Sequence, residues 1–156
     1  MPGFSCLAYH CHYVLYKLMS TSSPCSSTIL LVEDYPPGML VGALMIEHLG
    51  YSVETAACGA DAVEKVRAAT QPFMAIMMDV KMRDMDGFET TKSIRKLERE
   101  KGYSNTIIAV TAHALAGDRE RCLEAGMNDY ISKPIHPDIL AQKLAVLAKN
   151  LLQSHS

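Results

Sequence analysis

The chain has 156 residues, enough for one domain of ordinary size and too few for two. Apolar residues make up 49% and charged residues 21%, a balance typical of folded globular proteins and unlike that of disordered chains. The formal net charge of −2 excludes the strongly basic character of nucleic-acid-binding domains, so we expect no nucleic-acid partner.

Residues 1–27 differ in composition from the rest and are interpreted as a leader and linker. They lack the basic start and small-residue cleavage site of a secretory signal. Polar residues interrupt the apolar stretch too often for it to span a bilayer, so we expect no direct membrane contact. Some apolar residues fall at alternating spacings of three and four, which indicates the end of a helical connector; the alternative is a poorly ordered segment. These residues are Phe4, Leu7, Cys11, Val14 and Leu18.

The cysteines give a second indication of environment. Their number is odd, their spacing is irregular and no CxxC pair occurs, so we expect neither a disulfide framework nor a soft-metal site. The pattern favours a reducing cytoplasm. The residues are Cys6, Cys11, Cys25, Cys58 and Cys122.

From Thr28 onward, apolar runs alternate with segments of helical periodicity. The run TILLVED at 28–34 ends in two acids. The helix predicted after it stops at Gly50 and has apolar residues at helical spacing, namely Leu40, Leu44, Met45 and Leu49. The run YSVETAA at 51–57 alternates more weakly, which indicates a half-exposed edge strand. The segment ADAVEKVRAA at 60–69 then has the period of a helix.

The second half repeats the alternation. A buried strand is predicted in FMAIMMD, residues 73–79, before a helix over 88–100. The apolar run TIIAVT at 106–111 precedes a charged helix over 117–126 that Gly126 should close. A short strand DYISK, at 129–133, leads to a final helix that begins near Pro137 and has regularly spaced leucines at Leu140, Leu144, Leu147 and Leu151.

Five strands alternating with five helices predict an α/β fold, with a parallel sheet covered on both faces. Ligands of such sheets bind beyond the carboxyl ends of the strands. A polar group follows or ends four of the predicted strands, so these groups should converge on one rim: Glu33, Asp34, Asp79, Thr111 and Lys133. Their conjunction predicts a functional site there.

Three aspartates lie close together in MAIMMDVKMRDMDGFE, residues 74–89. Asp79 directly follows the buried run and should be the reactive one. Asp84 and Asp86 lie in the next loop, where we expect Gly87 to permit a turn and Asp86 to cap the following helix.

The predicted rim suits phosphoryl transfer. Three carboxylates require a cation, and oxygen ligands favour Mg²⁺. A carboxylate beside Mg²⁺ can attack phosphorus and form an aspartyl phosphate. Besides Mg²⁺, Lys133 and either the Thr111 hydroxyl or a backbone N–H can stabilise the phosphoryl oxygens.

Residues 28–152 resemble the receiver domain of two-component response regulators. The resemblance rests on ILLVED, MMDVKMRDMDG, IIAVTAHA and GMNDYISKPI, in the family's order and spacing. It implies a doubly wound, flavodoxin-like (βα)5 fold with strand order 2-1-3-4-5 and a cis peptide bond before Pro134. It further implies a phosphoacceptor signalling domain, with self-phosphorylation and self-dephosphorylation chemistry, rather than an enzyme.

The resemblance also implies roles for single residues. Asp79 receives a phosphoryl group from a phosphohistidine, and Lys133 binds the phosphate. Mg²⁺ is held by Asp34, Asp79, the backbone carbonyl of Lys81 and, through water, Glu33. Thr111 and Tyr130 are the switch residues, whereas Lys81 and His113 border the path of the hydrolytic water and are expected to prolong the phosphorylated state.

The chain departs from the family pattern at two places. Arg83 stands where proline is frequent, and Tyr35 with the Pro36-Pro37 pair follows the acids where smaller polar residues are commoner. Neither departure removes a reactive group.

The stretch TAHALAGDRERCLEAGMNDYISKPI is most similar to receivers fused to hybrid sensor histidine kinases. The implied partner is a sensor histidine kinase or a histidine phosphotransfer protein. The resemblance also suggests a homodimer through the fourth predicted helix, the fifth strand and the final helix. No effector domain is expected after the final helix, and residues 153–156 are interpreted as a tail.

The sequence is less consistent with three alternatives. The stretch DMDGFET resembles the nucleophile motif of haloacid-dehalogenase-like phosphohydrolases, with Asp84 as nucleophile and Asp86 as acid/base, but no strand runs straight into it. An EF-hand loop fails because Met82 and Ser93 would occupy its first and last ligand positions. A pseudo-receiver that binds partners without phosphorylation would be expected to lack one of the acids or the lysine.

Overall fold

The computed structural model describes residues 27–112 and 117–153, apart from the side chain of Leu152. Its strands are β1 (Thr28–Val32), β2 (Ser52–Ala56), β3 (Ala75–Asp79), β4 (Ile107–Thr111) and β5 (Asp129–Ser132). Its helices are α2 (Pro36–His48), α3 (Gly59–Ala68), α4 (Gly87–Lys101), α5 (Asp118–Glu124) and α6 (Pro137–Gln153). The interpretations of the leader and of residues 154–156 lie outside the described residues.

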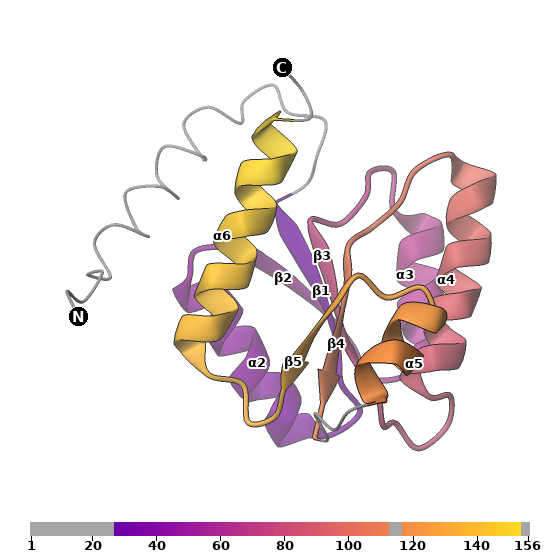
Figure 1. Ribbon diagram of the computed structural model, residues 1–156. Helices are drawn as coiled ribbons and strands as arrows, with labels where there is room; N and C mark the ends of the chain where they lie inside the picture. Colours follow the sequence, from indigo (N-terminus) through magenta and orange to yellow (C-terminus); the bar gives the residue numbers. More distant parts are fainter. Residues whose placement is uncertain (1–26, 113–116, 154–156) are drawn as a thin grey trace.

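All strand pairs are parallel and follow the order β2-β1-β3-β4-β5. Helices α2 and α6 cover one face of this sheet, and α3, α4 and α5 cover the other (Figure 1). Strand order therefore reverses between β1 and β3, as in other doubly wound folds. The predicted fold class and strand order are confirmed, and so is the cis bond between Lys133 and Pro134.

Each face of the sheet has its own apolar core. One core packs Ile94 of α4 and Val66 of α3 against the sheet, and the other packs Ile46 of α2 and Leu140 and Leu144 of α6. Every residue of β3 and β4 is buried, whereas β2 alternates between exposed and covered positions. This pattern explains why FMAIMMD and TIIAVT are continuous apolar runs and why the β2 sequence alternates more weakly.

Local sequence signals set the ends of α4. The Asp86 carboxylate accepts a hydrogen bond from the backbone N–H of Glu89 at 2.8 Å, which confirms the predicted cap. Gly102, at φ 75°, ends the helix in the left-handed conformation that glycine adopts most readily.

The structure gives Gly87 a different role from the predicted turn. A Cβ atom there would lie 2.4 Å from the backbone oxygen of Asp79 and 2.9 Å from Cα of Val80. Residue 87 is therefore glycine because the start of α4 packs directly against the backbone that carries Asp79.

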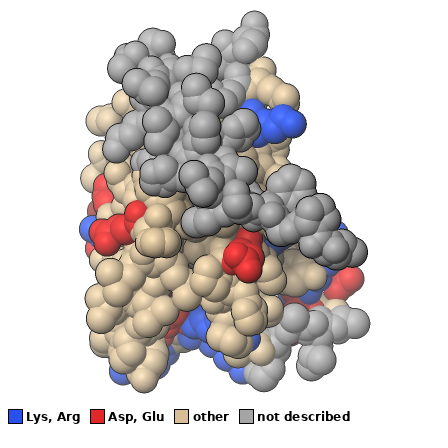
Figure 2. All heavy atoms as spheres, turned by 90° about the vertical axis from the view of Figure 1, so that its left-hand side faces the viewer, with Lys and Arg blue, Asp and Glu red and all other residues tan. Residues whose placement is uncertain are grey.

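Helix α2 exposes part of its apolar surface. Leu40 and Leu44, whose spacing helped to indicate this helix, are 62% and 55% exposed, and Val41 is 51% exposed. Gly42 and Ile46 are its buried residues. Figure 2 views the side of α2 and α6, where much of the described surface is uncharged and only a few charged groups interrupt it. The α2 sequence has no charged residue before Glu47.

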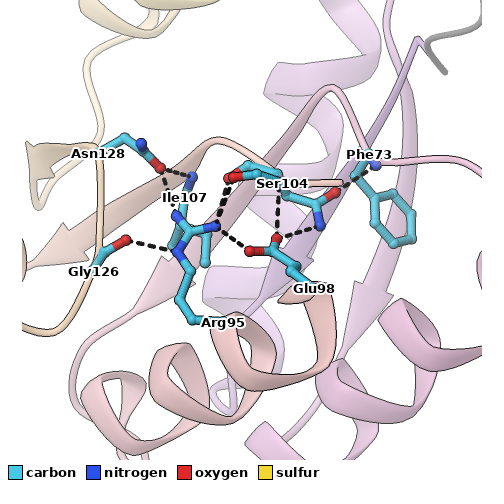
Figure 3. Close-up of polar contacts among 8 residues, drawn as sticks. Phe73, Arg95, Glu98, Ser104, Ile107, Gly126 and Asn128 are labelled. Atoms are coloured by element: carbon cyan, nitrogen blue, oxygen red, sulfur yellow. Dashed lines mark hydrogen bonds and ion pairs between the residues drawn. The ribbon is translucent and has the colours of Figure 1, made fainter. Parts of the chain in front are cut away.

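A polar network joins α4 to the segments that precede β4 and β5 (Figure 3). Arg95 donates to Glu98 at 2.6 Å, to the Asn105 carbonyl at 2.8 Å, to the Gly126 carbonyl at 2.9 Å and to the Asn128 side chain at 2.7 Å. The other oxygen of Glu98 accepts two hydrogen bonds from Asn105, each at 2.7 Å. The network lies at the amino ends of the strands, opposite the edge where the reactive groups were predicted.

Candidate phosphoacceptor site

The predicted rim residues lie at the carboxyl ends of four neighbouring strands. Glu33 and Asp34 follow β1, Asp79 ends β3, Thr111 ends β4 and Lys133 follows β5. Because parallel strands end at one edge of a sheet, their side chains converge beside the point where strand order reverses.

Lys133 bridges two buried carboxylates. Its ammonium donates to Glu33 Oε2 at 2.8 Å and to Asp79 Oδ2 at 3.0 Å. Glu33 and Asp79 are only 5% and 4% exposed, so both charges are largely removed from water. The Lys133 backbone N–H donates to the Thr111 carbonyl at 2.7 Å, which holds the end of β5 beside β4. The ammonium offsets part of the cost of burying two acids.

Burial and neighbouring charges shift the pKa values of this pair. Burial raises the pKa of Asp79, and the charge of Glu33 adds to the increase, whereas Lys133 opposes it without cancelling it. For Lys133, burial alone would lower the pKa, but its hydrogen bonds to Glu33 and Asp79 and the negative charges of these two acids together outweigh burial and raise the pKa. The ammonium form of Lys133 is therefore stabilised beside Asp79.

Asp34 is held by Arg83. Its Oδ2 accepts hydrogen bonds from both the backbone N–H and the Nε of Arg83, each at 3.0 Å. Burial alone would raise the pKa of Asp34, but these hydrogen bonds and the guanidinium charge lower it below its ordinary value. In the sequence, Arg83 stands out only as a departure from the family pattern, and no local signal indicates this contact.

The three acids can share one cation. Glu33, Asp34 and Asp79 each offer one carboxylate oxygen, and these oxygens lie within 4.8 Å of one another. An all-oxygen, anionic donor set of this size suits a hard divalent ion such as Mg²⁺. The donor chemistry thus fits the predicted metal.

The loop after β3 is anchored to the site. The Lys81 backbone N–H donates to Asp79 Oδ1 at 3.1 Å, so one oxygen of Asp79 faces this loop and the other faces Lys133. Asp84 and Asp86 are exposed, and Asp86 is engaged in capping α4. These placements do not favour the phosphohydrolase alternative, which requires one of these acids at the end of a strand.

An open cleft of about 1040 Å³ leads to the rim. Asp34, Lys81, Arg83, Thr111 and Arg121 are among the residues that line it. This volume is large enough for a phosphoryl donor to approach from solvent.

The remaining predicted residues lie at or beyond the edge of the site. Tyr130 is half-buried on β5, and the Lys143 ammonium lies 5.9 Å from the centre of its ring. His113 lies outside the described residues, so its predicted effect on phosphate lifetime stays a prediction.

Comparison with known proteins identifies the class. The sequence profile of the response regulator receiver domain matches residues 29–145. The chain therefore belongs to the receiver domain family, a signalling family of two-component systems.

Its relatives include receiver parts of hybrid sensor kinases. The chain is 39% identical over 137 residues to the signal transduction histidine-protein kinase BarA of Escherichia coli K12, and 37% identical over 128 residues to the sensor histidine kinase RcsC of Salmonella typhimurium. These matches cover 86% and 82% of this chain. The chain spans only 14% and 13% of the two kinases' lengths.

Solved structures agree with the sequence matches. The receiver domain of the sensor histidine kinase PA1611 from Pseudomonas aeruginosa, with magnesium in its active-site cleft, is 40% identical. Its TM-score is 0.70, with 80% of this chain and 98% of that chain covered. The Saccharomyces cerevisiae complex of the phosphotransfer protein Ypd1 with the Ssk1 receiver domain matches at TM-score 0.73 and 26% identity, covering 80% and 90%.

Among the helices of residues 27–112 and 117–153, none combines the length and apolar character needed to cross a membrane.

Proposed function

We propose that this chain accepts a phosphoryl group from a phosphohistidine onto Asp79 and changes conformation in response. The observation that carries the proposal is the pairing of buried Asp79 with Lys133, beside two further acids that can share a cation with it. The family assignment, and the magnesium in the cleft of the related PA1611 receiver, support the same conclusion.

The proposed reaction forms a bond between an Asp79 carboxylate oxygen and phosphorus while the nitrogen–phosphorus bond of the donor breaks. Mg²⁺, held by Asp34, Asp79, the Lys81 carbonyl and Glu33 through water, would neutralise negative charge on the phosphoryl oxygens. Lys133 would stabilise another phosphoryl oxygen. Its hydrogen bond to Glu33 fixes the position of the ammonium beside Asp79.

The proposed switch rests on Thr111 and Tyr130. Thr111 is 8% exposed at the end of β4 and lines the same cleft as Asp34. A charge-assisted hydrogen bond from its hydroxyl to the phosphoryl group would form in only one state, and the half-buried Tyr130 would move with it. This movement would reshape the face of α5, β5 and α6, which we also propose as the homodimer surface.

Incubation with acetyl phosphate and Mg²⁺ tests the reaction without a partner. Intact-mass measurement should show one added phosphoryl group, and removal of the metal with EDTA should prevent its addition. Without a divalent ion, Lys133 and Arg83 balance only two of the three acidic charges, so the site still repels the incoming phosphate. Labelling that is equally efficient in EDTA would contradict the metal-assisted mechanism. Absence of labelling under both conditions would favour a pseudo-receiver.

We further propose that the donor protein docks on α2. This helix starts two residues after Asp34 and exposes an uncharged stripe formed by Leu40, Val41 and Leu44. A histidine-bearing helix of a kinase or phosphotransfer protein could cover this stripe while its phosphohistidine reaches Asp79. The domain would then act in the cytoplasm, which fits the free thiols of Cys58 and Cys122 within the described residues.

The double variant Leu40→Ser/Leu44→Ser tests the docking surface. With a phosphorylated histidine phosphotransfer protein that donates to the wild-type chain, transfer should slow by about tenfold or more, because each half-exposed leucine loses about 1 kcal/mol of apolar burial. Rapid-quench measurements with subsaturating receiver give the rate. Labelling by acetyl phosphate should be unchanged.

Val146→Ser is the matched control, because Val146 lies on α6 and is similarly exposed, at 58%. It should leave transfer from the protein donor unchanged. Equal losses in the control and the α2 variant would argue against a specific role for α2.

A further inference from the structure

Arg83 makes three hydrogen bonds to Asp34, one of the acids in the proposed metal site. Two of them reach Oδ2, from the backbone N–H and from Nε, each at 3.0 Å. The third joins Nη2 to the Asp34 backbone oxygen at 3.1 Å. The guanidinium thus donates hydrogen bonds to both the carboxylate and the backbone oxygen of Asp34.

The exposures of the two partners differ sharply. The Asp34 side chain is 14% exposed, whereas that of Arg83 is 82% exposed. An exposed arginine can leave its partner and become hydrated at little cost, and exposed ion pairs contribute modestly to stability. Asp34 therefore stays in place, while another cation can replace the Arg83 guanidinium beside it.

The two cations at the rim divide the three acids between them. Lys133 contacts Glu33 and Asp79, and Arg83 contacts Asp34. Arg83 therefore neutralises the acid that Lys133 does not reach. A divalent ion that binds these three carboxylates must therefore share Asp34 with the positively charged guanidinium of Arg83.

We infer that Arg83 competes with Mg²⁺ for Asp34, because the positive guanidinium bound to this carboxylate disfavours a second cation at the same ligand. The inference rests on the metal site proposed above and adds to it a residue that lowers metal affinity. The backbone N–H of Arg83 can keep its bond to Oδ2 when the side chain leaves, because the other Asp34 oxygen remains available.

A positioning role would have the opposite effect. If the guanidinium mainly oriented Asp34 toward the metal, removing it would weaken Mg²⁺ binding. The sign of the change in affinity therefore separates competition from positioning.

Calorimetric titration with MgCl₂ of wild type, Arg83→Ala and Arg83→Lys tests the competition. Arg83→Ala should bind Mg²⁺ about two- to fivefold more tightly, the range expected for loss of one exposed ion pair. Arg83→Lys keeps the charge but lacks the fork that holds both the side chain and main chain of Asp34, so its affinity should fall between the two.

Arg121→Ala is the matched control. Arg121 lines the same cleft and carries the same charge, but its guanidinium lies 4.9 Å from the centre of the Phe88 ring and 3.8 Å from Asp118. Removing it should change Mg²⁺ affinity by less than about twofold. If both alanine variants gained Mg²⁺ affinity equally, the gain would reflect the net charge of the cleft rather than the contact with Asp34. That result would overturn the inference.

A second measurement does not depend on affinities. The Arg83 Nε–H resonance should be observable by NMR in metal-free protein, because this group is hydrogen-bonded to Oδ2. It should shift or broaden beyond detection as Mg²⁺ saturates the site. A resonance unchanged at saturation, or an Arg83→Ala affinity equal to or weaker than that of wild type, would overturn the inference.

The outcomes separate this inference from the proposed function. Asp34→Ala should weaken Mg²⁺ binding in the same titration, because it removes a metal ligand. Normal metal binding with no effect at position 83 would refute the competition alone. Failure of wild type to bind Mg²⁺ would refute both the metal site and the competition.

Discussion

Asp79→Asn should abolish phosphorylation by acetyl phosphate, whereas Asp84→Asn and Asp86→Asn should each retain one phosphoryl group per chain. Asp79 alone among these acids is buried at the end of a central strand, with Lys133 3.0 Å from one of its oxygens. An amide oxygen is a far weaker nucleophile than a carboxylate and cannot form the acyl phosphate. Intact-mass spectra after equal incubation times give the result.

The loop variants provide the control for this experiment. Asparagine at position 86 can still cap α4, so the fold should be preserved. Circular dichroism should show that all three variants are folded before labelling is compared. Phosphorylation that persists in Asp79→Asn and disappears in Asp84→Asn would instead support the phosphohydrolase alternative.

The largest effect on stability should come from Arg95→Met. Arg95 is 16% exposed, and its partner Glu98 is 4% exposed. Methionine removes every hydrogen bond that the guanidinium makes and leaves the Glu98 carboxylate buried without a cation. We expect the free energy of unfolding to fall by about 3–5 kcal/mol, the usual cost of breaking a buried ion pair. Urea unfolding followed by circular dichroism measures this loss.

Two further variants test the cause of this loss. Arg67→Met removes an exposed ion pair with Glu64 and should change stability by no more than about 0.5 kcal/mol. Adding Glu98→Gln to Arg95→Met should recover part of the lost stability, since no unpaired charge then remains buried. Strictly additive losses in the double variant would show that the ion pair is not the source.

The strand positions could be predicted because β3 and β4 are buried on both faces and therefore read as uninterrupted apolar runs. The same runs placed Asp79 and Thr111 at strand ends. In a parallel sheet the carboxyl ends of the strands lie at the same edge. The alternation of strands and helices was therefore enough to predict that these polar groups come together there.

Contacts between residues distant in the sequence could not be predicted. Nothing near Arg83 indicates that its side chain would reach Asp34, which lies 49 positions earlier. The Arg95 network likewise depends on loops that meet only in the folded chain. The exposure of Leu40 and Leu44 could not be predicted either. Apolar spacing indicates a helix but does not show how much of the helix surface the sheet covers.

The bond between Lys133 and Glu33 joins residues 100 positions apart, so the site depends on nearly the full length of the domain. During synthesis, both carboxylates partnered by Lys133 emerge long before the ammonium that lies between them. A chain interrupted before β5 has the nucleophile but not the cation beside it. A chain that ends before β5 would therefore lack the cation that the proposed phosphoryl transfer uses, however well its earlier strands pair.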